Sequence, residues 1–145
     1  GSSYGGYAAL WAVTRDPERY RCAASFAGVT DVARQLRYQS YELSGSDRSD
    51  WQATVRGEKG FDLDMISPLK QAGRLTRPVL LAHGDADKTV LYQQSTSYRD
   101  ALQKAGKPYE FIAYPGEDHG FENPDNMADW LSRLELFLAK HNPAQ

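Results

Sequence analysis

Three short and nearly continuous apolar segments divide the chain, and helix-like segments lie between and around them. The apolar segments span residues 22–29, 78–82 and 109–114, and each closes on or just before a glycine, a histidine or a proline. Short apolar runs bounded in this way are typical of buried strands. Strands that are apolar on both faces are expected in a parallel sheet that helices cover on both sides.

The segment 124–141 carries the clearest helical pattern. Asn123 is a suitable N-cap, and Pro124 suits the first helical position. Helices are also expected at about 7–13 and 92–105, where proline or glycine follows the helix-prone residues. Apolar side chains of 124–141 recur at helical spacing along one stripe: Met127, Trp130, Leu131, Leu134 and Leu138.

The order of these elements favours an α/β fold. Strands alternate with helices, which predicts βαβ units and about three parallel strands with flanking helices. Residues 30–60 are polar and mixed in character, so short helices and loops are expected there.

Composition narrows the class of protein further. The 145 residues fit one domain that can bury a core, with 41% hydrophobic and 25% charged residues. The formal charge is −2, which gives no basic excess to attract nucleic acid. The single cysteine, Cys22, excludes an internal disulfide and a cysteine-rich zinc site. No apolar run approaches the roughly 18 to 20 residues that a membrane span needs.

The first five residues, Gly-Ser-Ser-Tyr-Gly, fit the pattern G-x-S-x-G. In this nucleophile elbow a strand turns sharply into a helix, and small flanking residues avoid a steric collision around the strained serine, here Ser3. The backbone amide of Tyr4 would then donate to a developing oxyanion. Taken alone, the pattern also fits a glycine-rich helix start with an inert serine.

A nucleophilic serine needs a base, and the base needs an orienting carboxylate. Asp87 follows the second apolar strand and His119 follows the third, so Ser3, Asp87 and His119 occur in the chain order of α/β-hydrolases. Both loops lie just past carboxyl ends of strands, where open α/β sheets bind ligands. These three residues are the predicted catalytic set.

Other polar residues of these loops receive structural interpretations. We expect His83 to be a buried, hydrogen-bonded residue and His141 to be solvated at a helix end. Asp85 is expected to bind backbone amides of its loop. Asp118 is conceivable as the partner of His119, but a sequence neighbour is poorly placed to reach the ring. The chain shows no tight cluster of metal ligands, so we expect no metal and no cofactor.

Three segments together, GSSYGGYAAL, HGDADKTV and YPGEDHGF, resemble the catalytic domain of the prolyl oligopeptidase family of serine peptidases. Dipeptidyl peptidases and acylaminoacyl-peptidases belong to this family. The resemblance covers the whole chain but only about the last third of a typical member. It implies an α/β-hydrolase fold of which residues 1–145 are the C-terminal portion, starting at the nucleophile elbow and lacking the N-terminal strands.

The resemblance also implies the roles of residues. Ser3 would be the acyl-forming nucleophile, Asp87 the orienting acid and His119 the general base, while the amide of Tyr4 would be one oxyanion donor. The family's second donor resembles a tyrosine side chain on an earlier segment that this sequence lacks, so we expect impaired activity of residues 1–145 alone. By analogy Val29, Val32 and Val90, with Tyr4, would line the substrate pocket, although simple core packing explains them equally well.

The expected partner is a peptide substrate, together with the N-terminal part of the same polypeptide. Nucleic acid and membrane are not expected as partners, and homo-oligomerisation is left open. An esterase or other acyl hydrolase, and a non-catalytic module with the hydrolase fold, are the alternatives to a peptidase. The sequence leaves the compartment open between the cytoplasm and the periplasm or exterior.

Overall fold

A computed structural model describes residues 1–41, 44–57 and 60–144. Its centre is a parallel sheet of three strands, β1 (Ala23–Phe26), β2 (Val79–Gly84) and β3 (Tyr109–Tyr114), in the order β1-β2-β3. Every residue of β2, the central strand, is buried. β3 lies at an edge of this sheet and most of its residues are partly exposed.

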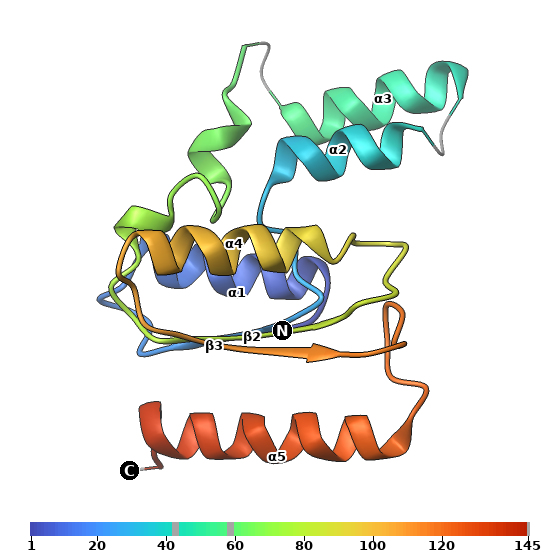
Figure 1. Cartoon of the computed structure of the whole chain (residues 1–145). Helices are drawn as coiled ribbons and strands as arrows, with labels where there is room; N and C mark the ends of the chain where they lie inside the picture. The colour runs from blue at the N-terminus through green and yellow to red at the C-terminus, as the bar shows by residue number, and fades with distance from the viewer. Residues whose placement is uncertain (42–43, 58–59, 145) are drawn as a thin grey trace.

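Helices cover the sheet on both faces, as Figure 1 shows. On one face lie α1 (Tyr4–Arg15) and α4 (Gln93–Lys104), and on the other lies α5 (Pro124–His141). This three-layer arrangement is the α/β architecture that the alternation of elements predicts. The α5 helix begins as expected, because the side chain of Asn123 accepts a hydrogen bond from the backbone amide of Asp125.

Each face of the sheet has its own apolar core. Because successive side chains of a strand point to opposite faces, neighbouring residues of β2 enter different cores. The core under α1 and α4 contains Leu10, Val13, Ala23, Ala72, Leu75, Val79, Leu81, Tyr98 and Leu102. The core under α5 contains Phe26, Ala27, Leu80, Ala82, Tyr114, Trp130 and Phe137.

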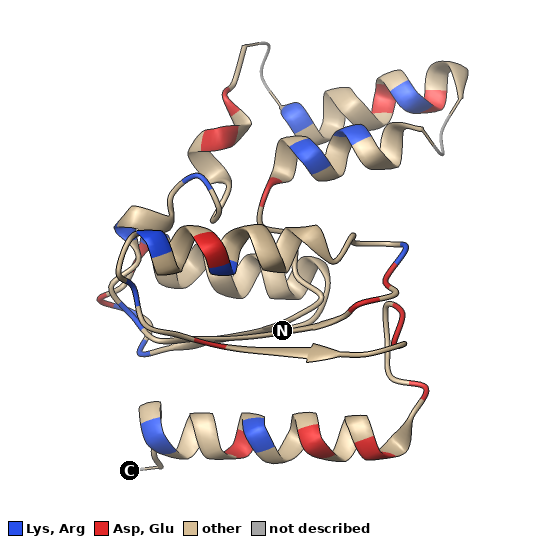
Figure 2. Cartoon of the chain, viewed as in Figure 1, with Lys and Arg blue, Asp and Glu red and all other residues tan. Residues whose placement is uncertain are grey.

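A helical hairpin lies outside these layers, on the side of α4 away from the sheet (Figure 1). It consists of α2 (Val32–Ser40) and α3 (Gly45–Arg56), and the short 3-10 helices η1 (Leu63–Ile66) and η2 (Ala72–Arg74) lead from it toward β2. None of the twelve residues of α3 is buried. Figure 2 shows acidic and basic residues interspersed along α3 and α5.

The predicted strand 109–114 and the predicted helix 124–141 agree with the structure at both ends. The first strand is shorter than the expected 22–29, because Ala27 adopts a positive φ of 50° and turns the chain out of the sheet. The predicted α/β class, with about three parallel strands and flanking helices, is confirmed. Among the described residues, no helix has the length and apolar character to cross a membrane.

Candidate active site

Ser3 lies in a sharp turn between an extended segment and α1. Ser2 forms a parallel bridge with Phe26, and the amide of Ser3 donates to the carbonyl of Phe26 at 2.9 Å. Ser3 has φ 54° and ψ −123°, in a region of backbone space that a non-glycine residue rarely adopts. Such strain is concentrated at functional sites. The turn therefore has the geometry that the motif predicts for a nucleophile elbow.

The glycines around Ser3 differ in their structural need. A Cβ atom on Gly1 would lie 2.3 Å from the carbonyl oxygen of Gly5, so a side chain does not fit there. A Cβ on Gly5 would meet nothing within 4 Å, which contradicts the expectation of a collision on both sides of the serine. The close contact lies one residue later, where a Cβ on Gly6 would be 2.9 Å from Cα of Gly28.

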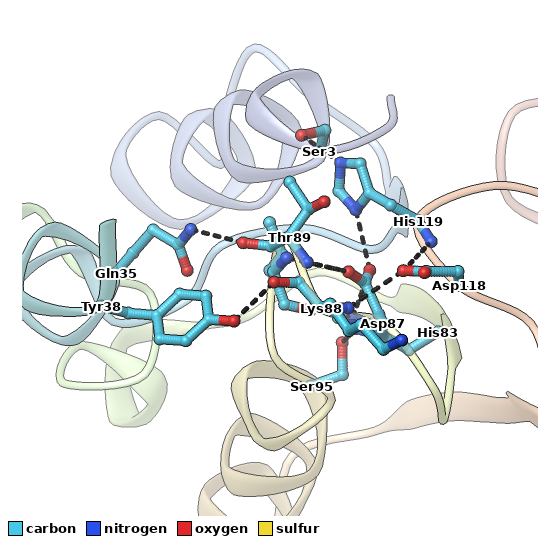
Figure 3. A network of polar contacts seen from close by, with 11 residues as sticks. Ser3, Gln35, Tyr38, His83, Asp87, Lys88, Thr89, Ser95, Asp118 and His119 are labelled. Atoms are coloured by element: carbon cyan, nitrogen blue, oxygen red, sulfur yellow. Dashed lines mark hydrogen bonds and ion pairs between the residues drawn. The ribbon is translucent and has the colours of Figure 1, made fainter. Parts of the chain in front are cut away.

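The structure brings together the three predicted residues, which come from three distant parts of the chain. Nε2 of His119 lies 2.9 Å from Oγ of Ser3, and Nδ1 of the same ring lies 2.8 Å from Oδ2 of Asp87 (Figure 3). Asp87 follows the carboxyl end of β2, and His119 follows that of β3. Both distances are within hydrogen-bonding range.

The Asp87 carboxylate is buried, with no exposed side-chain surface. Burial by itself raises the pKa of a carboxyl group, but hydrogen bonds outweigh it here. The two histidines, His83 and His119, and the amides of Val90 and Thr89 donate to the carboxylate and lower the pKa of Asp87 to about 2. Asp87 is therefore ionised at neutral pH.

Two further carboxylates join the loop after β2 to the loop after β3. Oδ1 of Asp118 accepts from the amides of Lys88, at 3.0 Å, and of His119, at 2.8 Å. Asp85 accepts from the amide of Gly116 at 2.7 Å. It therefore binds a backbone amide, as predicted, but this amide belongs to the loop after β3 and not to its own loop. Asp118 thus bridges the two loops through their backbones.

The two loops also approach each other closely at Gly84. A Cβ on this glycine would lie 2.2 Å from the carbonyl oxygen of Glu117, which no side chain could tolerate without a shift. The same carbonyl accepts from the amide of Ala86 at 3.0 Å. The loop that carries His119 therefore crosses directly over the start of the loop that carries Asp87.

Glu117 is buried and anchors the His119 loop to α5. Its carboxylate accepts from the side-chain amide of Asn126 at 2.7 Å and from the backbone amides of Glu122 and Asn123 at 2.7 and 3.1 Å. These hydrogen bonds lower the pKa of Glu117, and the bond from Asn126 has the largest effect on it. This role of Glu117 was not predicted, because Glu117 lies seven residues before α5 and no local pattern pairs it with that helix.

Side chains of α2 support the Asp87 loop from the other side (Figure 3). Nε2 of Gln35 donates to the carbonyl of Thr89 at 2.9 Å, and the hydroxyl of Tyr38 donates to the carbonyl of Lys88 at 2.6 Å. The start of α2 is itself held by Gln94, whose Oε1 accepts from the amide of Asp31 at 2.7 Å. These contacts join residues 50 or more positions apart, so local sequence patterns do not indicate them.

A largely apolar cavity of about 330 Å³ opens beside Ser3. Val29, Val32 and Val90, the three valines expected to line a pocket, all lie in its wall together with Tyr4. The remaining lining residues were not predicted, and several of them follow helical spacing along α2: Tyr7, Gln35, Leu36, Gln39, Trp51, Val55 and Thr89. Contact of the three valines and Tyr4 with a substrate stays a prediction.

The remaining histidines lie apart from the reacting atoms of this set. His83 is fully buried, as expected, and hydrogen-bonded at both ring nitrogens. His141 ends α5 and packs on Phe137, with ring centroids 4.7 Å apart. Within the described ranges, no group of three or more histidine, cysteine and acidic residues could hold a metal ion.

Comparison with known proteins decides the family. The sequence matches the model of the prolyl oligopeptidase family over residues 1–144. The chain belongs to this family. The resemblance noted in the sequence is thereby confirmed, and with it the assignment of the chain to a family of serine peptidases.

Relatives of this prolyl oligopeptidase family chain are much longer than the chain itself. It is 30% identical to dipeptidyl peptidase family member 6 of Caenorhabditis elegans, covering 95% of this chain and 19% of the relative. It is also 30% identical to dipeptidyl aminopeptidase BIII of Pseudoxanthomonas mexicana, covering 97% of this chain and 21% of the relative. The chain thus spans about a fifth of the length of these relatives.

Solved structures agree with the fold. A puromycin-hydrolysing peptidase of Mycobacterium tuberculosis superposes with a TM-score of 0.83 and 27% identity, covering 100% of this chain and 22% of the other. An acylaminoacyl peptidase superposes with a TM-score of 0.79 at 19% identity, covering 100% and 24%, and shows the fold alone. The family chain described here therefore has the architecture of these peptidases over its whole length.

Proposed function

We propose that this chain supplies the catalytic triad of a serine peptidase, with Ser3 as nucleophile, His119 as general base and Asp87 as orienting acid. The observation that carries the proposal is the continuous series of hydrogen bonds from Ser3 Oγ through the His119 ring to Asp87, at 2.9 and 2.8 Å. Membership of the prolyl oligopeptidase family supports the same reaction class.

The reaction begins with attack of Ser3 Oγ on the carbonyl carbon of a peptide bond. Nε2 of His119 takes the hydroxyl proton as the Oγ–C bond forms, and the ionised Asp87 stabilises the resulting imidazolium through Nδ1. The imidazolium then donates its proton to the leaving amine, and the C–N bond breaks. Water, deprotonated by His119, then attacks the acyl carbon, the C–Oγ bond breaks, and His119 returns the proton to Ser3 Oγ.

The start of α1 is the proposed site for the oxyanion of the tetrahedral intermediate. Tyr4 is the first residue of α1, so its amide has no acceptor within the helix. Backbone amides aimed at a developing negative charge, together with the helix dipole, stabilise such an intermediate. Tyr4 N–H is therefore the proposed oxyanion donor of this chain.

The cavity beside Ser3 is the proposed binding site for an apolar substrate side chain. Its valine, leucine and tryptophan lining favours burial of apolar surface, at about 25 cal/mol per Å². An apolar side chain in this cavity would place the scissile carbonyl next to Ser3. The proposed substrates are accordingly peptides with an apolar residue before the scissile bond.

The experiment compares the natural polypeptide with its Ser3→Ala variant. We expect a fluorophosphonate probe to label only the wild type, and kcat for a peptide anilide to fall roughly 10⁴-fold or more in the variant. Turnover of simple aryl esters without turnover of peptide amides would instead identify an esterase. Failure of Ser3 to react at all would identify a non-catalytic module. The lower activity expected of residues 1–145 alone stays a prediction, which the same assay tests.

A further inference from the structure

A second histidine contacts the same oxygen of Asp87 as His119 does. His83, at the carboxyl end of β2, is fully buried, and its Nε2 lies 3.1 Å from Oδ2 of Asp87 and 2.8 Å from the carbonyl oxygen of Val90. Nδ1 of His83 lies 2.7 Å from Oγ of Ser95 on α4 (Figure 3). The mechanism above does not use this buried imidazole.

The contacts of His83 assign its tautomer. Both atoms that Nε2 contacts, Oδ2 of the ionised Asp87 and the carbonyl oxygen of Val90, are acceptors, so Nε2 carries a hydrogen that the two oxygens share. In the neutral ring Nδ1 is then an acceptor, and the hydroxyl of Ser95 donates to it. Ser95 thereby holds His83 in the form that donates to Asp87.

The donors around Asp87 leave its carboxylate little freedom to rotate. Oδ1 accepts from the amides of Thr89 and Val90 at 2.8 and 2.9 Å, and Oδ2 accepts from His119 and His83 at 2.8 and 3.1 Å. Four donors match the approximately four lone-pair sites of an ionised carboxylate. Without His83, a lone pair on Oδ2 would remain unpaired in a buried site, and the carboxylate could turn away from His119.

We propose that His83, held by Ser95, is a positioning residue that aims Oδ2 of Asp87 at the His119 ring. The proposal rests on the proposed function, because it assigns a role in the same triad. Any buried histidine needs partners for both ring nitrogens, but a purely structural one need not direct one of them at the carboxylate of the proposed triad. The inference therefore extends the triad by one imidazole and one hydroxyl.

The test compares three variants of the natural polypeptide. His83→Leu removes the donor and keeps an apolar side chain, and we expect kcat to fall roughly 10- to 100-fold, the range for a lost hydrogen bond to a charged group. KM should stay within about threefold, because His83 is not part of the cavity wall. His83→Gln retains a side-chain N–H and should recover most of kcat, and Ser95→Ala should reduce kcat about threefold to tenfold.

A control variant and two NMR measurements separate positioning from a general loss of stability. Leu102→Ala empties part of the core on the same helix as Ser95 without touching Asp87, and it should lower Tm while leaving kcat unchanged well below Tm. In the wild type, ¹⁵N resonances of His83 should show a protonated Nε2 and an unprotonated Nδ1. The low-field proton resonance of the His119–Asp87 hydrogen bond should weaken in Ser95→Ala.

The outcomes are distinguishable from failure of the proposed function. If the wild type turns over peptide and Ser3→Ala does not, but His83→Leu retains wild-type kcat, the positioning role is wrong and the triad stands. A His83→Gln variant as impaired as His83→Leu, with the same Tm, would also overturn the inference. If His83→Leu does not fold, an unchanged kcat and an unchanged low-field resonance in Ser95→Ala overturn it. Absence of Ser3-dependent turnover in the wild type overturns the proposed function itself.

Discussion

Two parts of the molecule border the proposed site, and they are built in opposite ways. The loops after β2 and β3 are joined by carboxylate–amide bonds and by the close contact at Gly84. The helix α3 buries none of its residues, yet its Trp51 and Val55 contribute to the cavity wall. The proposed acid Asp87 and base His119 thus lie in the more constrained part, and part of the proposed substrate cavity lies in the less constrained one.

The largest effect should come from the constrained part. Asp87→Asn removes the charge that stabilises the imidazolium and allows the wrong tautomer of His119, so we expect kcat to fall roughly 10⁴-fold. Steady-state kinetics on a peptide anilide measure this loss. A fall of less than tenfold would show that Asp87 does not orient His119.

A smaller loss should follow from cutting the bridge between the loops. Asp118→Ala removes the oxygen that accepts from both Lys88 and His119, and we expect kcat to fall roughly tenfold with a lower Tm. Asp118→Asn keeps a side-chain carbonyl oxygen as acceptor and is the matched control, expected near wild-type values. Equal kcat values in the two variants would contradict the bridging role.

The less constrained part should affect binding rather than chemistry. Trp51→Ala removes apolar cavity wall, so we expect KM for substrates with a large apolar side chain to rise about threefold to tenfold, with kcat and Tm nearly unchanged. Phe61→Ala truncates another exposed aromatic residue outside the cavity wall and is the control. A fall in kcat without a rise in KM would show that Trp51 affects the chemical step and not substrate binding.

The smallest expected effect is a pH dependence of stability. The pKa of Asp87 is about 2 in the folded state and about 4 in an unfolded chain, so its contribution is fully present above pH 4 and is lost as pH falls toward 2. Between these values the unfolded state binds more protons, and stability rises with pH. Urea unfolding should therefore show the difference in unfolding free energy between wild type and Asp87→Asn shrinking from pH 4 to pH 2. A constant difference would contradict the low pKa.

The sequence was sufficient for the parts of the site that depend on order and local pattern. The strands predicted the loops that carry Asp87 and His119, and the motif around Ser3 predicted a strained turn. Hydrogen bonds between residues distant in the chain could not be predicted from the sequence. Gln35 bonds to Thr89 across 54 positions, and Gln94 bonds to Asp31 across 63. The positive φ of Ala27, which shortens β1, has no local sequence signal either. Glu117 was overlooked because its partners appear only once α5 packs beside it.

The contact at Gly84 has a consequence for protein engineering. Because the carbonyl of Glu117 occupies the space where a Cβ would stand, the shapes of the two loops depend on each other. A chimera that imports either loop from a homologue without the other loop should misplace the backbones that carry Asp87 and His119. We expect this even if every side chain named above were retained. Recombination in directed evolution should therefore place its crossover points outside residues 83–123, so that both loops are inherited as one block.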